Sequence, residues 1–288
     1  MNRSRAEPGG CGHKDCTDVV ERIRTLPCWQ SPVRIRAIPD GRTNQNYVVQ
    51  AGDRTYFARL GVDLPHHGIT RANEVRCCRL AAAMGISPMV VYAAEGVLVT
   101  EFVDGRTLVQ GEPVSNEILV ELARGLRRLH EYSVPADLAP FDPVERCRRQ
   151  LDALPDSAVS TARRHRIVKI LSHAPKLTAR SLVHADLIPE NVIVRGDAPI
   201  LVDWEYAGLG DPLVDLAMVG VHFGLSEQQT QDFVHAYGAF DSDAVILLKP
   251  VIAAREAIWC ATQIHVVGLA GDLEHYAQQC WNRVEADA

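Results

Sequence analysis

The sequence predicts an α+β protein with two lobes, a small β-rich N-terminal lobe and a larger, mainly helical C-terminal lobe. Short β-like runs separated by turn residues fill the first third, whereas apolar residues at helical spacing dominate the remainder. One hairpin-like pattern interrupts these helices. We expect an N-terminal extension at 1–30, whose Gly, Pro and Cys content is compatible with disorder, then lobes at 31–103 and 104–288.

The first lobe is predicted to be an antiparallel meander followed by a helix and two more strands. The strand-like runs are 33–38, 47–50, 55–60, 89–94 and 97–102. Turn residues separate the strands, as at Gly52-Asp53. Thr70 is the expected N-cap of a helix over 71–84, which Gly85 ends.

Helices are predicted from Ser115 to about residue 284. The clearest ends near His130, because its apolar residues recur every three or four positions, at Ile118, Leu119, Leu122, Leu126 and Leu129. Two more are expected over 144–154 and 162–172. A buried strand at 181–183 and a hairpin with arms at 192–194 and 200–202 then interrupt the helices.

Composition excludes several classes of partner. A net charge of -6 argues against nucleic-acid binding, which requires a basic face. No segment resembles a signal peptide or a membrane span, so we expect a cytoplasmic protein with no membrane partner. Cys11, His13 and Cys16 lack a second pair of metal ligands at a familiar spacing, so we expect no metal there.

The densest group of chemically active residues lies around the hairpin. His184, Asp186 and Asn191 form the pattern H-x-D-x-x-x-x-N, and Asp203 follows a short apolar run. The hairpin brings Asp203 beside Asn191, and their oxygen atoms suit Mg²⁺, while Asp186 remains available to accept a hydroxyl proton. This arrangement is typical of phosphoryl transfer from a nucleotide. His184 is expected to brace the loop through hydrogen bonds rather than act as a base.

Segments 41–47, 184–191, 203–208 and 211–217 resemble the choline/ethanolamine kinase family, part of the aminoglycoside-phosphotransferase and protein-kinase-like superfamily. The likeness runs from about residue 33 to 269. It implies a two-lobed protein-kinase-like fold with a catalytic hairpin. It also implies that Asp215 opens a helix and braces the catalytic loop.

The resemblance places a nucleotide site in the first lobe, with ATP and Mg²⁺ as cofactors. The loop over the phosphates would contain Gly41, Thr43, Asn44 and Asn46. Arg59 would replace the phosphate-binding lysine of protein kinases, in agreement with the absence of lysine between residues 15 and 168, and Glu74 would pair with it. Glu101 and Val103 would belong to the hinge that holds adenine.

Acceptor recognition is implied by the same resemblance. Glu205, Tyr206 and Trp259 match positions around an amine-binding aromatic cage. Glu256 stands where the family often has a second tryptophan, and His222 where it commonly has an acidic residue. Amine recognition is therefore expected without trimethylammonium selectivity.

The sequence thus predicts an ATP- and Mg²⁺-dependent kinase that phosphorylates the hydroxyl of choline, ethanolamine or a related amino alcohol. Thiamine and aminoglycosides are alternative acceptors, and a catalytically idle nucleotide-binding scaffold is an alternative of another class. The presence of Asp186, Asn191 and Asp203 together argues against the scaffold. The acceptor and the oligomeric state are left open.

Overall fold

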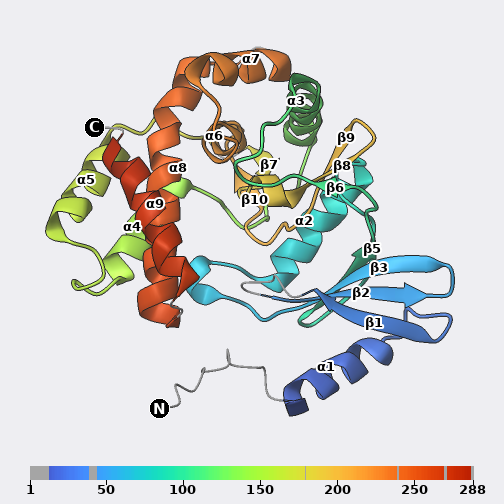
Figure 1. The fold of residues 1–288 in the computed structure, drawn as a ribbon. Helices are drawn as coiled ribbons and strands as arrows, with labels where there is room; N and C mark the ends of the chain where they lie inside the picture. Colours follow the sequence, from blue (N-terminus) through green and yellow to red (C-terminus); the bar gives the residue numbers. More distant parts are fainter. Residues whose placement is uncertain (1–12, 39–43, 179, 239, 269–270, 287–288) are drawn as a thin grey trace, which may run out of the picture. The chain divides into compact units, whose positions relative to one another are not determined.

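The structure is a computed structural model that describes residues 13–38, 44–178, 180–238, 240–268 and 271–286 (Figure 1). The chain divides into two compact units, the first comprising 1–62 and 90–102, the second comprising 63–89 and 103–288. This division differs from the predicted lobe boundaries, because residues 63–89 group with the second unit. The predicted α+β class is confirmed by a sheet in the first unit and helices in the second.

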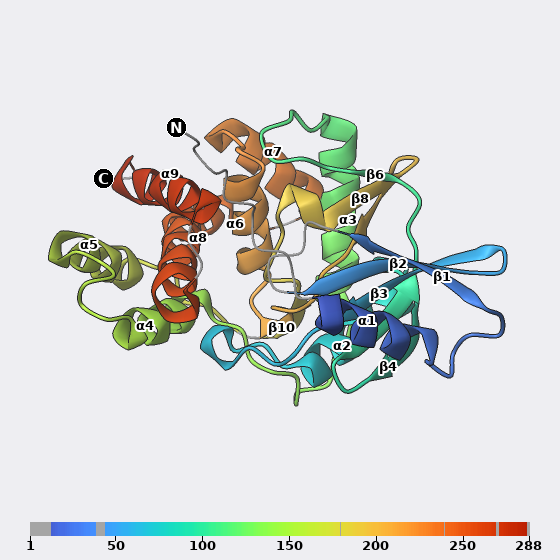
Figure 2. The ribbon, with the colours of Figure 1, turned by 60° about the horizontal axis from the view of Figure 1, so that its bottom comes forward.

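The first unit is built on an antiparallel five-stranded sheet in the order β1-β2-β3-β5-β4 (Figure 2). Its strands are β1 (Val33–Ile38), β2 (Gln45–Ala51), β3 (Arg54–Leu60), β4 (Val90–Ala94) and β5 (Val97–Glu101). Gly52, with a φ of 59°, and Asp53 form the two-residue turn between β2 and β3. Such a tight hairpin requires a left-handed residue, which glycine adopts without strain.

Helix α1 (His13–Arg24) packs on this sheet and belongs to its core. Ile23 is fully buried together with Val49 and Val99. The indole Nε1 of Trp29 donates a hydrogen bond to the carbonyl of Ile23 at 2.7 Å. The described part of the predicted extension is therefore folded, whereas the side chains of Cys11, His13 and Cys16 lie outside the described residues.

The second unit is mainly helical (Figure 1). Its helices are α2 (Arg71–Ala83), α3 (Asn116–Glu131), α4 (Pro143–Ala153), α5 (Thr161–Ser172), α6 (Leu213–His222), α7 (Glu227–Tyr237), α8 (Ser242–Thr262) and α9 (Asp272–Ala286). Shorter helical segments are the 3-10 helices η1 (Pro65–His67) and η2 (Pro189–Asn191) and the π-helix η3 (Gln263–Val267). The apolar α6 and α8 pack most extensively on each other and form the centre of the unit.

Short strands position the loops of the second unit. Strand β7 (Ser181–Val183) pairs with β10 (Gly208–Gly210), and β6 (Arg106–Thr107), β8 (Val192–Arg195) and β9 (Ala198–Leu201) form a three-stranded sheet. The predicted hairpin is confirmed as β8–β9, whereas β10 was not predicted. Its glycines permit a close approach, because a Cβ on Gly210 would lie 2.6 Å from the Val183 side chain.

Thr70 occupies the predicted N-cap position of α2, and Ser115 caps α3. Ser115 accepts a hydrogen bond from the Ile118 amide at the start of α3. Thr70 occupies the N-cap of α2, but its side chain makes no capping hydrogen bond. Instead Asp63 Oδ1 accepts the Arg71 amide at 2.7 Å, so a residue distant in sequence satisfies this helix end.

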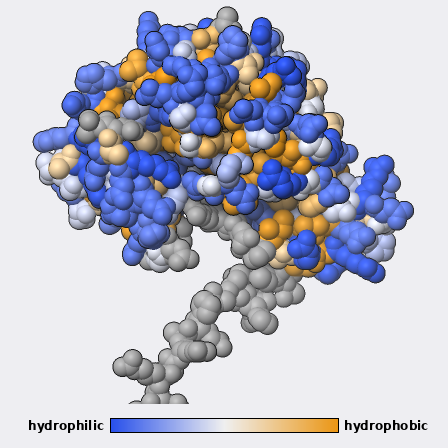
Figure 3. All heavy atoms as spheres, turned by 45° about the horizontal axis from the view of Figure 1, so that its top comes forward, coloured by the Kyte–Doolittle hydropathy of each residue, from blue (hydrophilic) through white to orange (hydrophobic). Residues whose placement is uncertain are grey.

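No helix of the described chain is long and apolar enough to cross a membrane. On the face drawn in Figure 3, hydrophilic side chains predominate and hydrophobic ones form patches between them.

Candidate active site

The loop that follows β7 is fixed by a buried carboxylate. Asp215, in the first turn of α6, accepts the backbone amides of His184 at 2.8 Å and Ala185 at 2.9 Å. His130 Nε2 lies 3.0 Å from the same carboxylate. Burial alone would raise the pKa of Asp215, but these hydrogen bonds and the nearby imidazoles hold it below its ordinary value. The predicted bracing role of Asp215 is confirmed.

His184 supports the same loop from the other side. Its Nε2 lies 3.0 Å from the carbonyl of Val202, and the centre of its ring lies 4.5 Å from that of the tilted Trp204 ring. The side chain is fully buried, and burial lowers its pKa, so the ring is neutral. The predicted bracing role is confirmed.

Asp186 and Asn191 are in direct contact. Asn191 Nδ2 donates to the carbonyl of Asp186 at 2.9 Å and to its Oδ2 at 3.1 Å. The Val202 amide donates to the Asn191 carbonyl at 3.0 Å, which joins Asn191 to the strand end that carries Asp203. Both Ala185 (φ 61°) and Asp203 (φ 64°) have left-handed backbones, unusual for residues with a Cβ and frequent at functional sites.

The electrostatic environment of Asp186 makes it a stronger base than an exposed aspartate. Burial is the main cause of a pKa raised to about 8; Arg255 opposes the rise, and the carboxylates of Asp203, Glu256 and Glu205 add to it. Arg255 of α8 lies with one guanidinium nitrogen 3.7 Å from Asp186 Oδ1.

The predicted aromatic acceptor residues Tyr206 and Trp259 are together, and two cations lie close to the Tyr206 ring. Trp259 Nε1 donates to the Tyr206 hydroxyl at 3.0 Å. The guanidinium of Arg255 lies 4.8 Å from the centre of the Tyr206 ring, and that of Arg146 lies 5.5 Å from it. Neither arginine was assigned a role from the sequence. For Arg255 the available signal was a charged residue in the apolar second half of α8, which is rare unless the residue is paired or functional.

Glu205 and Glu74 share a cation within the second unit. Arg71 donates from one nitrogen to Glu205 Oε2 and to Glu74 Oε2, both at 2.9 Å. All three side chains are buried. The predicted pairing of Glu74 with Arg59 stays a prediction, because the two residues belong to different units.

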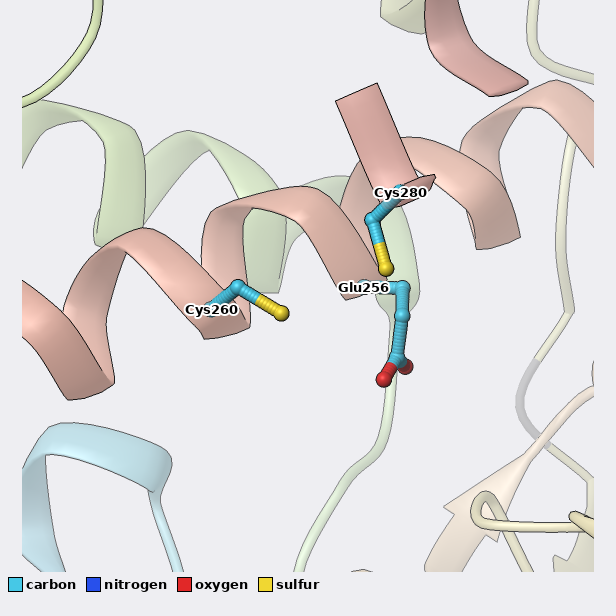
Figure 4. Close-up of side chains that lie close together, drawn as sticks. All are labelled: Glu256, Cys260 and Cys280. Atoms are coloured by element: carbon cyan, nitrogen blue, oxygen red, sulfur yellow. The ribbon is translucent and has the colours of Figure 1, made fainter. Parts of the chain in front are cut away.

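Glu256 points toward α9 (Figure 4). Its Oε1 accepts a hydrogen bond from Tyr276 at 2.8 Å, and its carboxylate lies beside the thiols of Cys260 and Cys280, within 4.8 Å of them. Three such donors could hold a metal ion, but structural zinc sites use four protein ligands. We assign no metal to this cluster.

The predicted nucleotide residues of the first unit lie on its sheet. Asn46 of β2 is the cross-strand neighbour of Arg59 on β3, so both side chains lie on the same face. Arg59 is buried, and Asn46 Oδ1 is buried without a hydrogen bond to any described residue. Glu101 ends β5. The remaining predicted residues are Asn44 before β2, Val103 in the second unit, and Gly41 and Thr43, which lie outside the described residues.

His222, at the end of α6, is buried, and neither ring nitrogen has a hydrogen-bond partner among the described residues. Burial lowers its pKa to about 4, while Glu256 opposes this shift and Arg255 and Arg283 add to it. At neutral pH the residue is therefore an uncharged imidazole.

Replacing His222 with leucine is expected to remove part of the acid sensitivity of folding. The unfolded chain takes up this proton near pH 6.5, but the native ring does so only near pH 4. The contribution of His222 to stability is therefore complete above pH 6.5 and falls by roughly 3 kcal/mol as the pH drops through the native pKa. Urea unfolding at about pH 7 and about pH 4.5 measures the difference. His165→Leu, at an exposed position, should retain the wild-type pH dependence of stability. A wild-type pH dependence in His222→Leu would show that His222 does not titrate with a lowered pKa in the native protein.

Known proteins resemble the chain in sequence and in fold. The sequence profile of the phosphotransferase enzyme family (APH) matches residues 34–248. Protein LicA of Haemophilus influenzae is 24% identical over 207 residues, which cover 68% of this chain but only 60% of that relative. Choline kinase LicA of Streptococcus pneumoniae superposes with a TM-score of 0.76 at 18% identity, covering 95% of this chain and 99% of that one. A choline/ethanolamine kinase family protein of Mesorhizobium loti gives 0.72 at 22% identity and covers 94% of each chain. The predicted fold and family resemblance are confirmed.

Proposed function

The chain belongs to the phosphotransferase enzyme family, and on that premise we propose that it is an ATP- and Mg²⁺-dependent kinase for a small amino alcohol. Choline, ethanolamine and related compounds are the first candidates, because LicA and choline/ethanolamine kinase structures are among its relatives. The main observation in support is the hydrogen bond between Asp186 and Asn191. Asn191 is in turn bonded to Val202, the residue before Asp203.

Asn191 and Asp203 would hold Mg²⁺. Asn191 Nδ2 is engaged by Asp186, so its oxygen Oδ1 is the atom that remains for a cation, and Asp203 adds a carboxylate. Such hard oxygen donors fit magnesium. When bound, the ion would neutralise charge on the transferred phosphoryl group.

Asp186 would orient the acceptor hydroxyl and accept its proton. In that step the acceptor oxygen bonds to the γ-phosphorus, and the bond from that phosphorus to the oxygen of the ADP leaving group breaks. The bracing by Asp215 fixes the position of the loop that carries Asp186. Positioning and charge neutralisation would supply most of the rate. In the first unit, Arg59 and Asn46 would contact the phosphates, with Asn44 in the adjoining loop.

Glu205, Tyr206, Trp259 and Glu256 are the proposed acceptor residues. The carboxylates would attract an amine, whereas the guanidinium groups near the Tyr206 ring disfavour a bulky trimethylammonium there. We therefore expect ethanolamine-like acceptors to be preferred over choline.

An acceptor panel tests the proposal directly. We expect ADP release to be stimulated about tenfold or more by at least one amino alcohol and to disappear when EDTA removes the divalent cation. The panel should contain choline, ethanolamine, thiamine and an aminoglycoside, with phosphorylated product identified by mass spectrometry. An Asp203→Ala variant should require more Mg²⁺ for the same rate. ATP binding without stimulation by any acceptor would instead support a nucleotide-binding scaffold.

A further inference from the structure

We propose that the acceptor carries an anionic group, a carboxylate or a phosphate, which binds Arg146 in a pocket next to the aromatic pair. The inference rests on the proposed kinase activity and narrows the amino alcohols to those that also bear a negative charge. It follows from a pocket and two buried arginines in the second unit, none of which the predicted phosphotransfer site uses.

The pocket lies between η1, α4 and the end of α8 and has a volume of about 420 Å³. Its charged or titratable lining residues are Arg146, Arg149, His66 and His67, and no aspartate or glutamate lines it. A pocket whose charged side chains are all cationic attracts anions and repels cations.

Arg146 is the centre of this pocket. The residue is 7% exposed, and among the described residues its side chain has one hydrogen bond, from a terminal nitrogen to the His67 carbonyl. No carboxylate of the described residues lies within 4 Å of it. A guanidinium has five N–H donors, so four of them have no acceptor in the described protein. Burial, reinforced by Arg255, lowers its pKa to about 10, which leaves it charged at neutral pH.

A buried cation without a counter-ion is costly, and a bound anion removes the cost. The guanidinium fork matches a carboxylate or a phosphate with two parallel hydrogen bonds. Burial lowers the pKa of His67 to about 4, so this imidazole is neutral and adds no charge to the pocket.

His67, which lines the pocket, packs near two aromatic residues of the candidate acceptor site. The centre of its ring lies 6.1 Å from that of Trp259 and 6.5 Å from that of Tyr206. Tyr206 also lies close to Arg255. The guanidinium of Arg255 makes no hydrogen bond with a described residue, and its nearest carboxylate is that of Asp186. An acceptor with its hydroxyl at Asp186 could therefore place an anionic group at Arg146.

Matched acceptor pairs test the inference. Ethanolamine and L-serine differ by one carboxylate, and glycerol and glycerol 1-phosphate differ by one phosphate. We expect kcat/KM to be about 10- to 100-fold higher for one or both anionic members, the range that corresponds to ~1.5–3 kcal/mol for a hydrogen bond to a charged group. A preference for serine would indicate that the pocket binds a carboxylate, and a preference for glycerol 1-phosphate would indicate that it binds a phosphate. Equal or better activity with the uncharged or cationic members would overturn the inference.

Variants of α4 give the matched control. Arg146→Gln should raise KM for the anionic acceptor about 10- to 100-fold and leave KM for ATP nearly unchanged. Arg148→Gln, an exposed arginine of the same helix outside the pocket, should behave as wild type. Arg149→Gln, at the exposed rim, provides a second pocket variant that does not threaten folding. An equal loss toward ethanolamine and serine in Arg146→Gln would overturn the proposed role.

A binding experiment separates failure of the inference from failure of the proposed function. Inorganic phosphate should bind the nucleotide-free protein, measured by calorimetry, with a Kd about tenfold or more weaker in Arg146→Gln but not in Arg148→Gln. This result without turnover of any acceptor would support the anion pocket and refute the kinase assignment. Phosphate binding that is the same in both variants would refute the anion pocket, whatever the activity.

Discussion

Replacing Asp186 with alanine is expected to lower kcat by about 10²- to 10⁴-fold, the range for loss of a general base. The carboxylate is the proposed acceptor of the hydroxyl proton, and it lies beside Asn191. ATP affinity should change little, because the predicted phosphate-binding residues Arg59 and Asn46 lie on the sheet of the first unit. Steady-state kinetics and nucleotide binding on the same preparation measure both quantities.

Asp197 supplies the matched control for this prediction. It is an exposed aspartate in the turn between β8 and β9, and Asp197→Ala should retain wild-type kcat. If Asp186→Ala kept its activity, Asp186 could not be the base, and the proposed mechanism would be wrong.

Replacing Asp215 with alanine is expected to destabilise the protein by roughly 3–5 kcal/mol, the cost of leaving one partner of a buried charged network alone. Two backbone amides and His130 would lose their acceptor in a fully buried environment. Urea unfolding measures the loss, and kcat should fall with it because the loop of Asp186 loses its support. Asp243→Ala, an exposed aspartate in the first turn of α8, should stay within about 0.5–1 kcal/mol of wild type.

The same network gives a pH dependence of known sign. The native pKa of Asp215 lies below its ordinary value, so its contribution to stability is complete above the unfolded pKa of ~3.9 and is lost as the pH falls through the native one. Asp215→Asn should therefore flatten the decrease in unfolding free energy below about pH 4. A wild-type slope in that variant would show that the carboxylate is not ionised in the native protein.

The reacting groups could be predicted because their arrangement is local in sequence. Asp186, Asn191 and Asp203 belong to one loop and one hairpin, and the strand pattern alone brings them together. The nucleotide residues were assigned through the family resemblance and stay predictions.

The pocket could not be predicted because it depends on packing between distant segments. Arg146 and Arg255 lie on α4 and α8, and only the tertiary structure places both guanidinium groups near Tyr206. Helical periodicity assigns charged residues to solvent by default, so it gives no account of a buried arginine. Strand β10 also depends on tertiary packing and was not predicted, since a Gly-Leu-Gly run has little intrinsic preference for a strand.

Helix α8 carries Arg255, Glu256 and Trp259 within about one turn, while most of its other residues are core. In the proposed function, α8 contributes to the choice of acceptor, whereas Asp186 lies on the loop that follows β7. A few substitutions on this one helix could give a duplicated gene a new acceptor while the loop of Asp186 stayed intact. Diversification of acceptors in such a lineage would then be concentrated in α8 and its neighbour α4, with the phosphotransfer loop inherited unchanged.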